Sequence, residues 1–295
     1  IKIESYKIEP SELILTDEGK IYHLDLAPSE VATTIITVGD PGRVEMVSKY
    51  FDTIDVKAEH REFKTHTGTY KGKRISVIST GIGPDNIDIV FNELDALVNI
   101  DFENRSIKSE HTTLDIIRIG TSGSLIEEIE VDSFLISAVG IGLDNVMHYY
   151  EDIDTFIERD FAKKFIDHTQ WNPDNSVPYA VKADEGLLAK LSSKKTVNGI
   201  TITNVGFYGP QGRVLRAQLR DENLNEKLTS FRLDGKKITN MEMETATMYG
   251  MAKLLGHRAI SMNAIIANRA TGNFSKNTYK TVDALIQYTL EKIVQ

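Results

Sequence analysis

Cysteine is absent from the 295 residues, so the chain has no disulfide framework, no thiolate metal site and no cysteine nucleophile. An excess of positive charge is also missing, because the formal net charge is -9 at pH 7. This argues against nucleic acid or an anionic membrane surface as a partner. No apolar run is long enough to span a bilayer, and the first ten residues are unlike a secretory signal. We therefore expect a cytoplasmic protein.

What the sequence does contain is enough apolar material, 41% of its residues, for a large core. One large α/β domain or two smaller ones would both fit this length, and we favour a single domain over residues 1–295. Several β-branched runs end in glycine-containing turns that lead into stretches with helical spacing, which is typical of α/β proteins. Residues 1–20 read as an N-terminal arm.

The stretch IIRIGTSGSL, residues 116–125, is the one around which the chain is organised. Its apolar start predicts a buried strand, and we expect a polar turn over residues 120–123. Ligands in open parallel sheets bind at the carboxyl ends of strands, so Arg118 and Thr121 are placed to meet an anionic, hydroxyl-rich ligand. The alternative is a plain turn, with Arg118 in a surface ion pair.

A second candidate anion site lies in TTIITVGDPGRVEMV, residues 33–47. A strand, a turn containing Gly39 and the start of a helix follow one another, and Arg43 adds a fork of donors. No Gly-Lys-Ser/Thr follows, so this is not a Walker loop. The alternative is a turn in which Pro41 merely starts a helix.

Two further glycine turns, GIGPDN at 81–86 and GIGLDN at 140–145, lack the last glycine of the dinucleotide fingerprint. A nicotinamide cofactor is therefore not supported. Arg61 and Glu62 are predicted on a strand, where a solvated face is the favoured interpretation. For His23, a structural role is the more common one.

The segment GFYGPQGR, residues 206–213, predicts a base-binding loop. On an extended loop Gln211 and Arg213 would point the same way, and together they match the edge of a planar heterocycle. Phe207 could stack on its face. A turn with solvated polar tips is the alternative.

Acidic residues precede a predicted helix at MEMETATM, residues 241–248. Acids at a helix start usually complement the helix dipole. A carboxylate beside a buried strand edge is also a natural acceptor for two neighbouring hydroxyls, such as those of a ribose.

Six motifs occur in one order, and the set resembles the nucleoside phosphorylase family, in particular its uridine-cleaving members: GDPGRV, HREF, RIGTSG, FYGPQGR, MEMETATM and IIANRATG. The resemblance runs from about His23 to Arg269. It implies a single α/β domain with a central mixed, partly closed sheet flanked by helices. It also implies homo-oligomers, either dimers or hexamers built from dimers, with shared active sites.

The resemblance further implies which residues bind phosphate and ribose. Phosphate would be held by one group of residues, with Arg61 coming from a neighbouring subunit: Gly39, Arg43, Arg61, Arg118 and Thr121. Ribose would be held by a second group, with His23 from the neighbour: His23, Thr121, Glu242, Met243 and Glu244.

For the base, the implied residues are Phe207, Gln211, Arg213 and Arg269. The implied reaction is phosphorolysis of uridine to uracil and ribose 1-phosphate, with Arg118, Gln211, Arg213 and Glu244 as the catalytic residues. Phosphate attacks the anomeric carbon through an oxocarbenium-like transition state. No cofactor is expected and no metal takes part in catalysis. A potassium ion near Glu62, Ile75 and Ser79 is the one ion that the resemblance suggests.

Three features depart from the family or narrow it. The usual bacterial turn Gly-Ile-Gly-Gly-Pro-Ser reads GIGPDN here, so we expect a different phosphate-side loop. The polar segment 99–110 is longer than in compact bacterial members, which leaves the choice between dimer and hexamer open. Asn268 and Arg269 stand where purine-specific relatives carry a Ser-Asp pair, and this favours uracil.

Three other functions remain as alternatives: a purine nucleoside phosphorylase, a nucleoside hydrolase of the same fold, and a non-catalytic nucleoside-binding protein. Arg43, Arg61 and Arg118 argue against the last of these, because a mere nucleoside binder has no reason to hold free phosphate.

Overall fold

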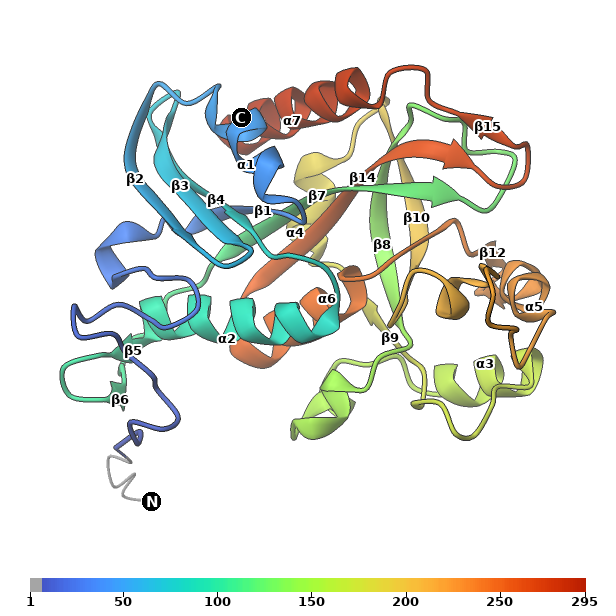
Figure 1. Ribbon diagram of the computed structural model, residues 1–295, viewed down its shortest axis with the longest axis horizontal. Coiled ribbons are helices and arrows are strands. Elements are labelled where there is room, and N and C mark those ends of the chain that lie inside the picture. The colour runs from blue at the N-terminus through green and yellow to red at the C-terminus, as the bar shows by residue number, and fades with distance from the viewer. Residues whose placement is uncertain (1–6) are drawn as a thin grey trace.

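The computed structural model describes residues 7–295, and its central feature is a mixed sheet of eleven strands in the order β15-β14-β8-β10-β13-β7-β1-β4-β3-β2, with β9 paired to β8 (Figure 1). Strand β14 pairs with both β8 and β7, so that β14, β8, β10, β13 and β7 close into a ring. Strands β1, β4, β3 and β2 continue from β7 as an open wing. The expected mixed, partly closed sheet is confirmed.

The strands of this sheet are β1 (Thr34–Val38), β2 (Thr53–His60), β3 (Phe63–Tyr70), β4 (Lys73–Ser79), β7 (Asp115–Ser124), β8 (Phe134–Gly142), β9 (Tyr179–Lys182), β10 (Thr196–Thr203), β13 (Asn240–Glu242), β14 (Arg258–Asn268) and β15 (Asn273–Phe274). Two small hairpins lie outside it, β5 (Ile100–Asp101) with β6 (Ser106–Ile107), and β11 (Arg232–Leu233) with β12 (Lys236–Lys237). The helices are α1 (Pro41–Ser48), α2 (Pro84–Asn99), α3 (Phe161–Thr169), α4 (Glu185–Leu191), α5 (Leu224–Ser230), α6 (Thr245–Leu255) and α7 (Thr278–Val294).

Helices cover the sheet on two sides. Helices α2 and α6 pack against each other, and α1 and α7 contact each other on the opposite side (Figure 1). The main core fills the space between these layers and the sheet. A smaller apolar cluster forms where α3 packs on α5, around Phe161, Phe165 and Phe231.

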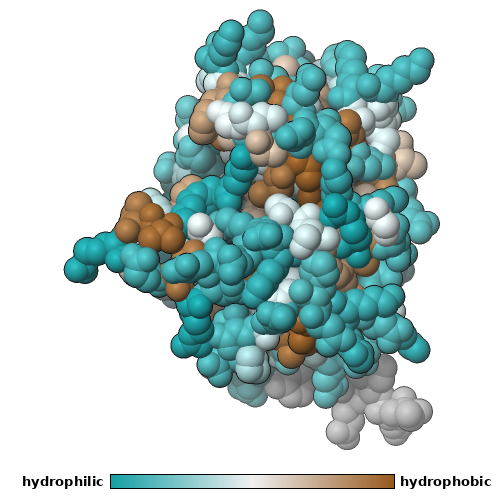
Figure 2. Space-filling model, turned by 90° about the vertical axis from the view of Figure 1, so that its right-hand side faces the viewer, coloured by the Kyte–Doolittle hydropathy of each residue, from teal (hydrophilic) through white to brown (hydrophobic). Residues whose placement is uncertain are grey.

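Several large apolar side chains are exposed, among them Ile107, Leu215 and Phe274. The face shown in Figure 2 is mainly hydrophilic, with hydrophobic side chains in separate groups. Within residues 7–295, no helix has both the length and the apolar character needed to cross a membrane.

Local sequence signals account well for the helices beside the pocket. Asp40 caps α1 by accepting a hydrogen bond from the Gly42 N–H at 2.8 Å, and Pro41 takes the first helical position, where its missing N–H costs nothing. Helix α6 ends at Gly256, whose φ of +76° suits glycine. Helix α4 is capped by Asp184, whose side chain accepts a hydrogen bond from the Leu187 N–H at 2.8 Å.

The predicted turn over residues 120–123 is wrong, because β7 runs through to Ser124. Gly120 pairs with Asn263 and Ser122 with Ile265 on β14, while Gly123 pairs with Met241 on β13. These partners lie more than a hundred residues away, so the glycines are held as strand by long-range pairing that local composition does not report. Likewise, Gly140 to Gly142 belong to β8, and the Gly142 backbone makes room for the Tyr179 ring.

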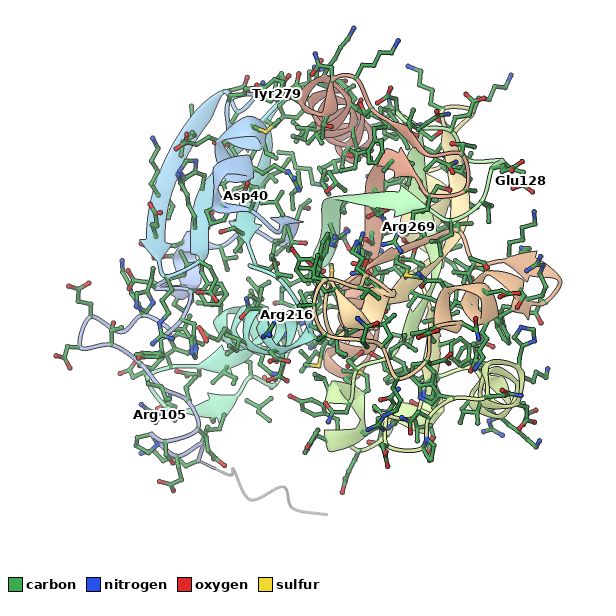
Figure 3. All side chains as sticks on the ribbon, turned by 45° about the vertical axis from the view of Figure 1, so that its right-hand side comes forward. Asp40, Arg105, Glu128, Arg216, Arg269 and Tyr279 are labelled. Carbon is green, nitrogen blue, oxygen red and sulfur yellow. The ribbon has the colours of Figure 1, made fainter. Side chains whose placement is uncertain are left out.

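The polar segment 99–110 forms the β5–β6 hairpin and holds the part of the N-terminal arm that the structure describes. The Ile8 N–H donates to the Arg105 carbonyl at 2.8 Å, and the Arg105 guanidinium donates to the Leu13 carbonyl at 2.8 Å. In Figure 3, Arg105 lies far from Asp40 and Arg269. Residues 1–6 of the predicted arm lie outside the described residues, so the domain boundary at residue 1 stays a prediction.

Candidate active site

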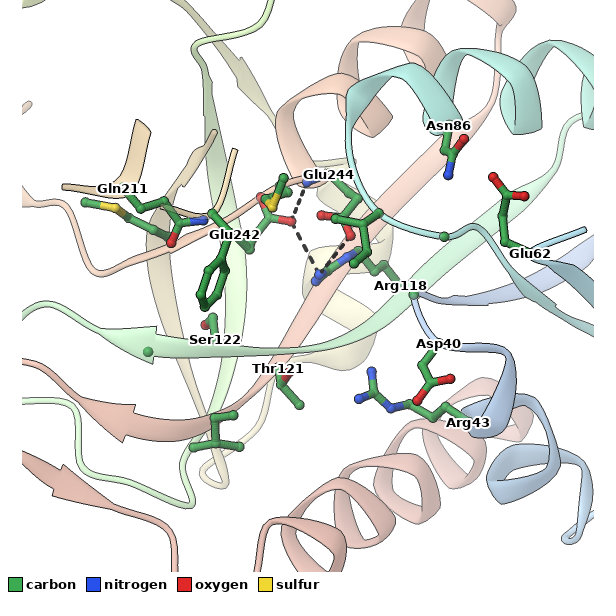
Figure 4. A pocket seen from close by; sticks show the side chains of 18 of the residues that line it. Asp40, Arg43, Glu62, Asn86, Arg118, Thr121, Ser122, Gln211, Glu242 and Glu244 are labelled. Carbon is green, nitrogen blue, oxygen red and sulfur yellow. Dashed lines mark hydrogen bonds and ion pairs between the residues drawn. The ribbon is translucent and has the colours of Figure 1, made fainter. Parts of the chain in front are cut away.

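A cavity of about 750 Å³ lies between the wing and the closed ring (Figure 4). Strands β1 and β4 contribute the residues that follow their carboxyl ends, and β7, β13 and β14 contribute side chains from the ring. The cavity brings together most of the predicted site residues: Gly39, Arg43, Arg118, Thr121, Phe207, Gln211, Arg213, Glu242, Met243, Glu244 and Arg269.

Two arginines, Arg43 and Arg118, line the wing side of the cavity. Arg43 projects from the first turn of α1, and Arg118 comes from the middle of β7. Burial, and secondarily the positive charge of Arg118, lower the pKa of Arg43, although a guanidinium remains charged at neutral pH. Two partly desolvated cations beside the N-terminus of α1 make this end of the cavity a site for a small anion.

Arg118 is held in place from several directions. Its Nη1 donates to Ser261 Oγ at 3.2 Å and to Asn263 Oδ1 at 3.1 Å, while its Nη2 lies 3.4 Å from Glu242 and 3.9 Å from Glu244. A Cβ atom at Gly120 would come within 2.2 Å of the same guanidinium. Glycine at position 120 therefore provides the space that Arg118 occupies across the face of β7.

The two acids of this site differ in their surroundings. Glu242 accepts hydrogen bonds from the Glu244 N–H at 2.7 Å and the Thr245 N–H at 3.0 Å, and from the Thr203 hydroxyl at 2.6 Å. It thus satisfies the free N–H groups at the start of α6. Glu244 occupies the N-cap position of α6, but its side chain makes no capping hydrogen bond there. Burial raises the pKa of its carboxyl to about 7, with Arg118 opposing the shift and Glu242 adding to it. Glu244 is the acid left to receive ligand hydroxyls.

At the opposite end of the cavity, Gln211 lies between two arginines. Its Oε1 accepts from Arg213 Nη1 at 2.7 Å and from Arg269 Nη2 at 3.4 Å, and its Nε2 donates to the Gly206 carbonyl at 3.1 Å. Burial lowers the pKa of Arg213, and burial and then Arg213 lower that of Arg269. The Arg213 guanidinium carbon lies 3.9 Å from the centroid of the Phe207 ring.

The loop that carries these groups is not extended as predicted. Gly209–Gln211 form a short 3-10 helix, and Gly212 has a φ of +70°. This tight turn, rather than strand-like alternation, brings Gln211 and Arg213 together. Gly212 is required there, because a Cβ would come within 2.2 Å of the Asn225 side chain.

His23 and Arg61 do not line the cavity, but they lie close to each other. His23 Nδ1 is 2.5 Å from the Glu93 carboxylate, and its ring is 4.8 Å from that of Tyr22. The Arg61 guanidinium carbon lies 5.9 Å from the same Tyr22 ring. Arg61 and Glu62 were predicted on a strand, but they form the turn between β2 and β3, where Arg61 has a φ of 54°.

The cavity also includes residues that sequence reasoning did not assign: Asp40, Pro41, Gly81, Ile82, Asn86, Ser122, Gly123, Met241 and Ile266. Most of them immediately follow a strand or are next to a predicted site residue in the sequence. This position is the feature from which they could have been predicted. Glu62 and Asn86 both lie near Gly81, which has a φ of +72° and leaves no room for a Cβ between them (Figure 4).

Of the three residues named for potassium, only Glu62 reaches the cavity. Ile75 and Ser79 are buried in β4, and the Ser79 hydroxyl already donates to the Glu62 carbonyl at 2.6 Å and accepts from the Lys64 N–H at 2.7 Å. Among residues 7–295, no cluster of three or more His, Cys, Asp or Glu side chains could hold a metal ion.

Comparison with known proteins agrees with this geometry. The family model described as the phosphorylase superfamily matches residues 33–295. The chain belongs to the phosphorylase superfamily. This superfamily member is therefore a pentosyltransferase, which moves a pentosyl group between a nucleoside base and phosphate.

Individual relatives of this phosphorylase carry different substrate names. A uridine phosphorylase of Thermococcus kodakarensis is 31% identical over 282 residues, which are 92% of this chain and 85% of that protein. A DeoD-type purine nucleoside phosphorylase of Listeria welshimeri is 25% identical over 276 residues, 92% of this chain and 99% of that protein. A solved Trypanosoma brucei nucleoside phosphorylase, described as showing uridine phosphorylase activity, superposes with a TM-score of 0.86 at 30% identity and covers 96% of this chain and 99% of its own.

Proposed function

We propose that this phosphorylase converts uridine and inorganic phosphate to uracil and ribose 1-phosphate. The observation that carries the proposal is the pairing of Gln211 with Arg213 and Arg269 at one end of a cavity whose other end holds Arg43 and Arg118. The names of the archaeal and trypanosomal relatives support uridine as the nucleoside.

Phosphate would bind at the Arg43 and Arg118 end, with the Gly39 backbone and the Thr121 hydroxyl beside it. The two arginines hold the phosphate nucleophile next to the anomeric carbon. The entropy cost of bringing the two reactants together is therefore met on binding and not in the reaction step. An oxygen of phosphate forms the new bond to the anomeric carbon while the bond to the base nitrogen breaks.

Ribose would lie against Glu244 and Met243. The ionised Glu244 carboxylate accepts hydrogen bonds from two neighbouring hydroxyls, and its negative charge favours the positive charge that develops on the sugar ring. Glu242 accepts hydrogen bonds from the backbone N–H groups of Glu244 and Thr245 and so fixes the position of Glu244. We therefore assign Glu242 as a positioning residue.

The base leaves with the electron pair of the broken bond. Arg213, oriented by the Gln211 oxygen, stabilises the negative charge that develops on the pyrimidine, and Phe207 packs on its face. Arg269 fixes Gln211 from the other side. The departing base takes up a proton through water, and the attacking hydrogen phosphate gives up its proton as it becomes the phosphate ester, so the overall reaction balances.

His23 and Arg61 would act on the site of a neighbouring subunit. They lie together around Tyr22 and outside their own cavity, as expected for groups that serve another copy. Such sharing would add a third arginine to each phosphate site, in a homo-oligomer built from dimers. A potassium ion at Glu62, Ile75 and Ser79 remains a prediction.

The direct test is uracil release from uridine, followed by absorbance with and without inorganic phosphate. We expect release to depend on phosphate and ribose 1-phosphate to form in equal amount. Equal rates in phosphate-free buffer would identify a hydrolase, and uridine binding without turnover would identify a non-catalytic binder.

Inosine is the substrate that tests the purine alternative, and we expect it to be poor. The Asn268 side chain donates to the carbonyls of Ile126 and Ile129 and accepts from the N–H groups of Ala270 and Thr271, so it organises a loop and offers no acid to a purine N7. Comparable kcat/KM values for inosine and uridine would overturn the assignment to pyrimidines.

A further inference from the structure

The inside of the closed strand ring is polar where an apolar filling would be expected. Four side chains on four different ring strands are completely buried, namely Ser137 on β8, Thr201 on β10, Asn240 on β13 and Asn263 on β14. Two more inward-facing residues, Arg118 and Ser122, come from the same face of β7 and are each 7% exposed. The large majority of buried polar groups in proteins are hydrogen-bonded, so we expect these six to form one network.

They do form a continuous chain of hydrogen bonds between Arg118 and Ser122. Arg118 Nη1 donates to Asn263 Oδ1 at 3.1 Å, and Asn263 Nδ2 contacts Ser137 Oγ at 3.4 Å. The Ser137 and Thr201 hydroxyls are 2.5 Å apart, and Thr201 donates to Asn240 Oδ1 at 2.8 Å. Asn240 Nδ2 then donates to Ser122 Oγ at 2.9 Å.

The direction of donation along this chain follows from its first member. A guanidinium can only donate, so it orients the Asn263 amide with its oxygen toward Arg118 and its nitrogen toward Ser137. Thr201 donates to Asn240 and therefore accepts from Ser137. The Asn240 oxygen accepts from the Thr201 hydroxyl and faces the Thr239 hydroxyl, which also lies 3.0 Å from the Ile200 carbonyl. This leaves the Asn240 nitrogen to donate to Ser122.

Ser122 is the last member, and its oxygen is the acceptor of that final bond. Among residues 7–295, the Ser122 hydroxyl hydrogen has no protein acceptor in this arrangement, and Ser122 lines the cavity. Figure 4 shows Ser122 on β7 near Gln211 and Glu242, at the base end of the site. The network thus leaves the Ser122 hydroxyl free to donate a hydrogen bond to a ligand at the base end of the cavity.

We propose that Ser122 donates a hydrogen bond to a carbonyl oxygen of the departing pyrimidine and that Asn240 is the positioning residue that enforces this donor role. This inference rests on the proposed function, since it assumes a pyrimidine base at that end of the cavity. The base gains negative charge as its bond to the sugar breaks, so the hydrogen bond is stronger in the transition state than in the bound substrate.

The test compares two variants that remove the donor in different ways. Ser122→Ala deletes the hydroxyl. Asn240→Asp keeps the shape and the acceptor for Thr201 and Thr239 but has no N–H for Ser122, whose own hydrogen then turns inward to the new carboxylate. Thr239→Val is the matched control, because it removes another hydroxyl that bonds Asn240 Oδ1 and leaves the donor to Ser122 in place.

Each variant is assayed with uridine and with 5-fluorouridine, whose base is the more stable anion and depends less on donors in the transition state. We expect Ser122→Ala and Asn240→Asp to lose about 10-fold in kcat/KM for uridine, as for a hydrogen bond to a charged group, and distinctly less for 5-fluorouridine. Thr239→Val should keep the wild-type ratio between the two substrates. A purely structural effect would lower both substrates equally.

Equal losses on both substrates, or an Asn240→Asp variant that behaves like wild type, would overturn the role assigned to Ser122 and Asn240. A wild-type enzyme that releases no uracil in the presence of phosphate would instead overturn the proposed function, and the assignment of a pyrimidine partner with it. Thermal unfolding of every variant shows whether a loss of activity reflects a loss of folded protein.

Discussion

Glu242 and Glu244 lie two residues apart, yet only Glu242 is fully engaged by the protein itself. Glu242 receives the N–H groups of Glu244 and Thr245 and the Thr203 hydroxyl, whereas Glu244 lies 3.9 Å from Arg118 and lines the same cavity. One acid therefore organises the start of α6 and the other faces the ligand. The two glutamates thus have different roles, one structural and one in ligand binding, and mutating each in turn distinguishes these roles.

Replacing each acid by its amide is the first prediction. Glu244→Gln should lower kcat/KM for uridine by about 100-fold, because a charged acceptor for ribose hydroxyls is lost, with little change in the melting temperature. Glu242→Gln should lower the melting temperature, since an amide can accept with only one of its two groups at the start of α6. Kinetics and thermal unfolding of the two proteins side by side distinguish these outcomes, and a Glu244→Gln variant with wild-type kinetics would contradict the assignment.

The second prediction concerns the pH dependence of activity. Because the pKa of Glu244 is raised to about 7, the carboxyl is protonated in much of the free enzyme below that pH and cannot accept from two hydroxyls. The value of kcat/KM for uridine should therefore rise between about pH 6 and pH 8. Inorganic phosphate also ionises in this range, so Glu244→Gln is the control, and its profile should keep only the part due to phosphate.

Stability should respond to the same group in the opposite sense. The folded protein keeps the Glu244 proton up to about pH 7, whereas the unfolded chain releases it near the ordinary glutamate pKa of 4.5. The free energy of unfolding contributed by this group therefore falls as pH rises through that window. Denaturant titrations of wild type and Glu244→Gln across the window measure the difference, and identical pH slopes would argue against a raised pKa.

A methyl group at Gly120 is the third prediction. Since the added Cβ would lie 2.2 Å from the Arg118 guanidinium, Gly120→Ala should displace that group from the phosphate end. Overpacking of this kind costs about 1–3 kcal/mol, so we expect KM for phosphate to rise by about 10-fold. Gly209→Ala, whose Cβ would meet no atom closer than 3.7 Å, is the control in steady-state kinetics with varied phosphate.

The fourth prediction tests whether sites are shared between subunits. Arg61→Ala and Glu244→Ala should each be nearly inactive alone. When subunits of the two proteins exchange, one site of a mixed dimer receives both lesions and the other receives none, so activity should partly return. Mixed oligomers are detected by mass spectrometry. If they form and activity stays absent, both residues serve their own subunit.

Several elements could be predicted because their signals are local. The cap at Asp40, Pro41 at the first position of α1 and Gly256 after α6 act within one turn of helix, and the apolar residues of α2 and α7 recur at helical spacing. The groups that follow strand ends, such as Gly39 and Arg43, could be expected at one edge of the sheet for the same reason. Their specific roles came from resemblance to a family rather than from the residues alone.

What only the tertiary structure decided depends on pairing between distant segments. Strand β7 continues through Gly120 to Ser124 because β14 and β13 pair with it, and local composition there is that of a turn. In the sequence, Asn240 and Asn263 are isolated polar residues in two strands. Only the closure of the strand ring brings both side chains into one hydrogen-bond network. His23 and Arg61 likewise meet at Tyr22 because residues 21–23 fold against the β2–β3 turn. Sequence periodicity reports whether a side chain is buried, whereas the partner it meets there is set by long-range geometry.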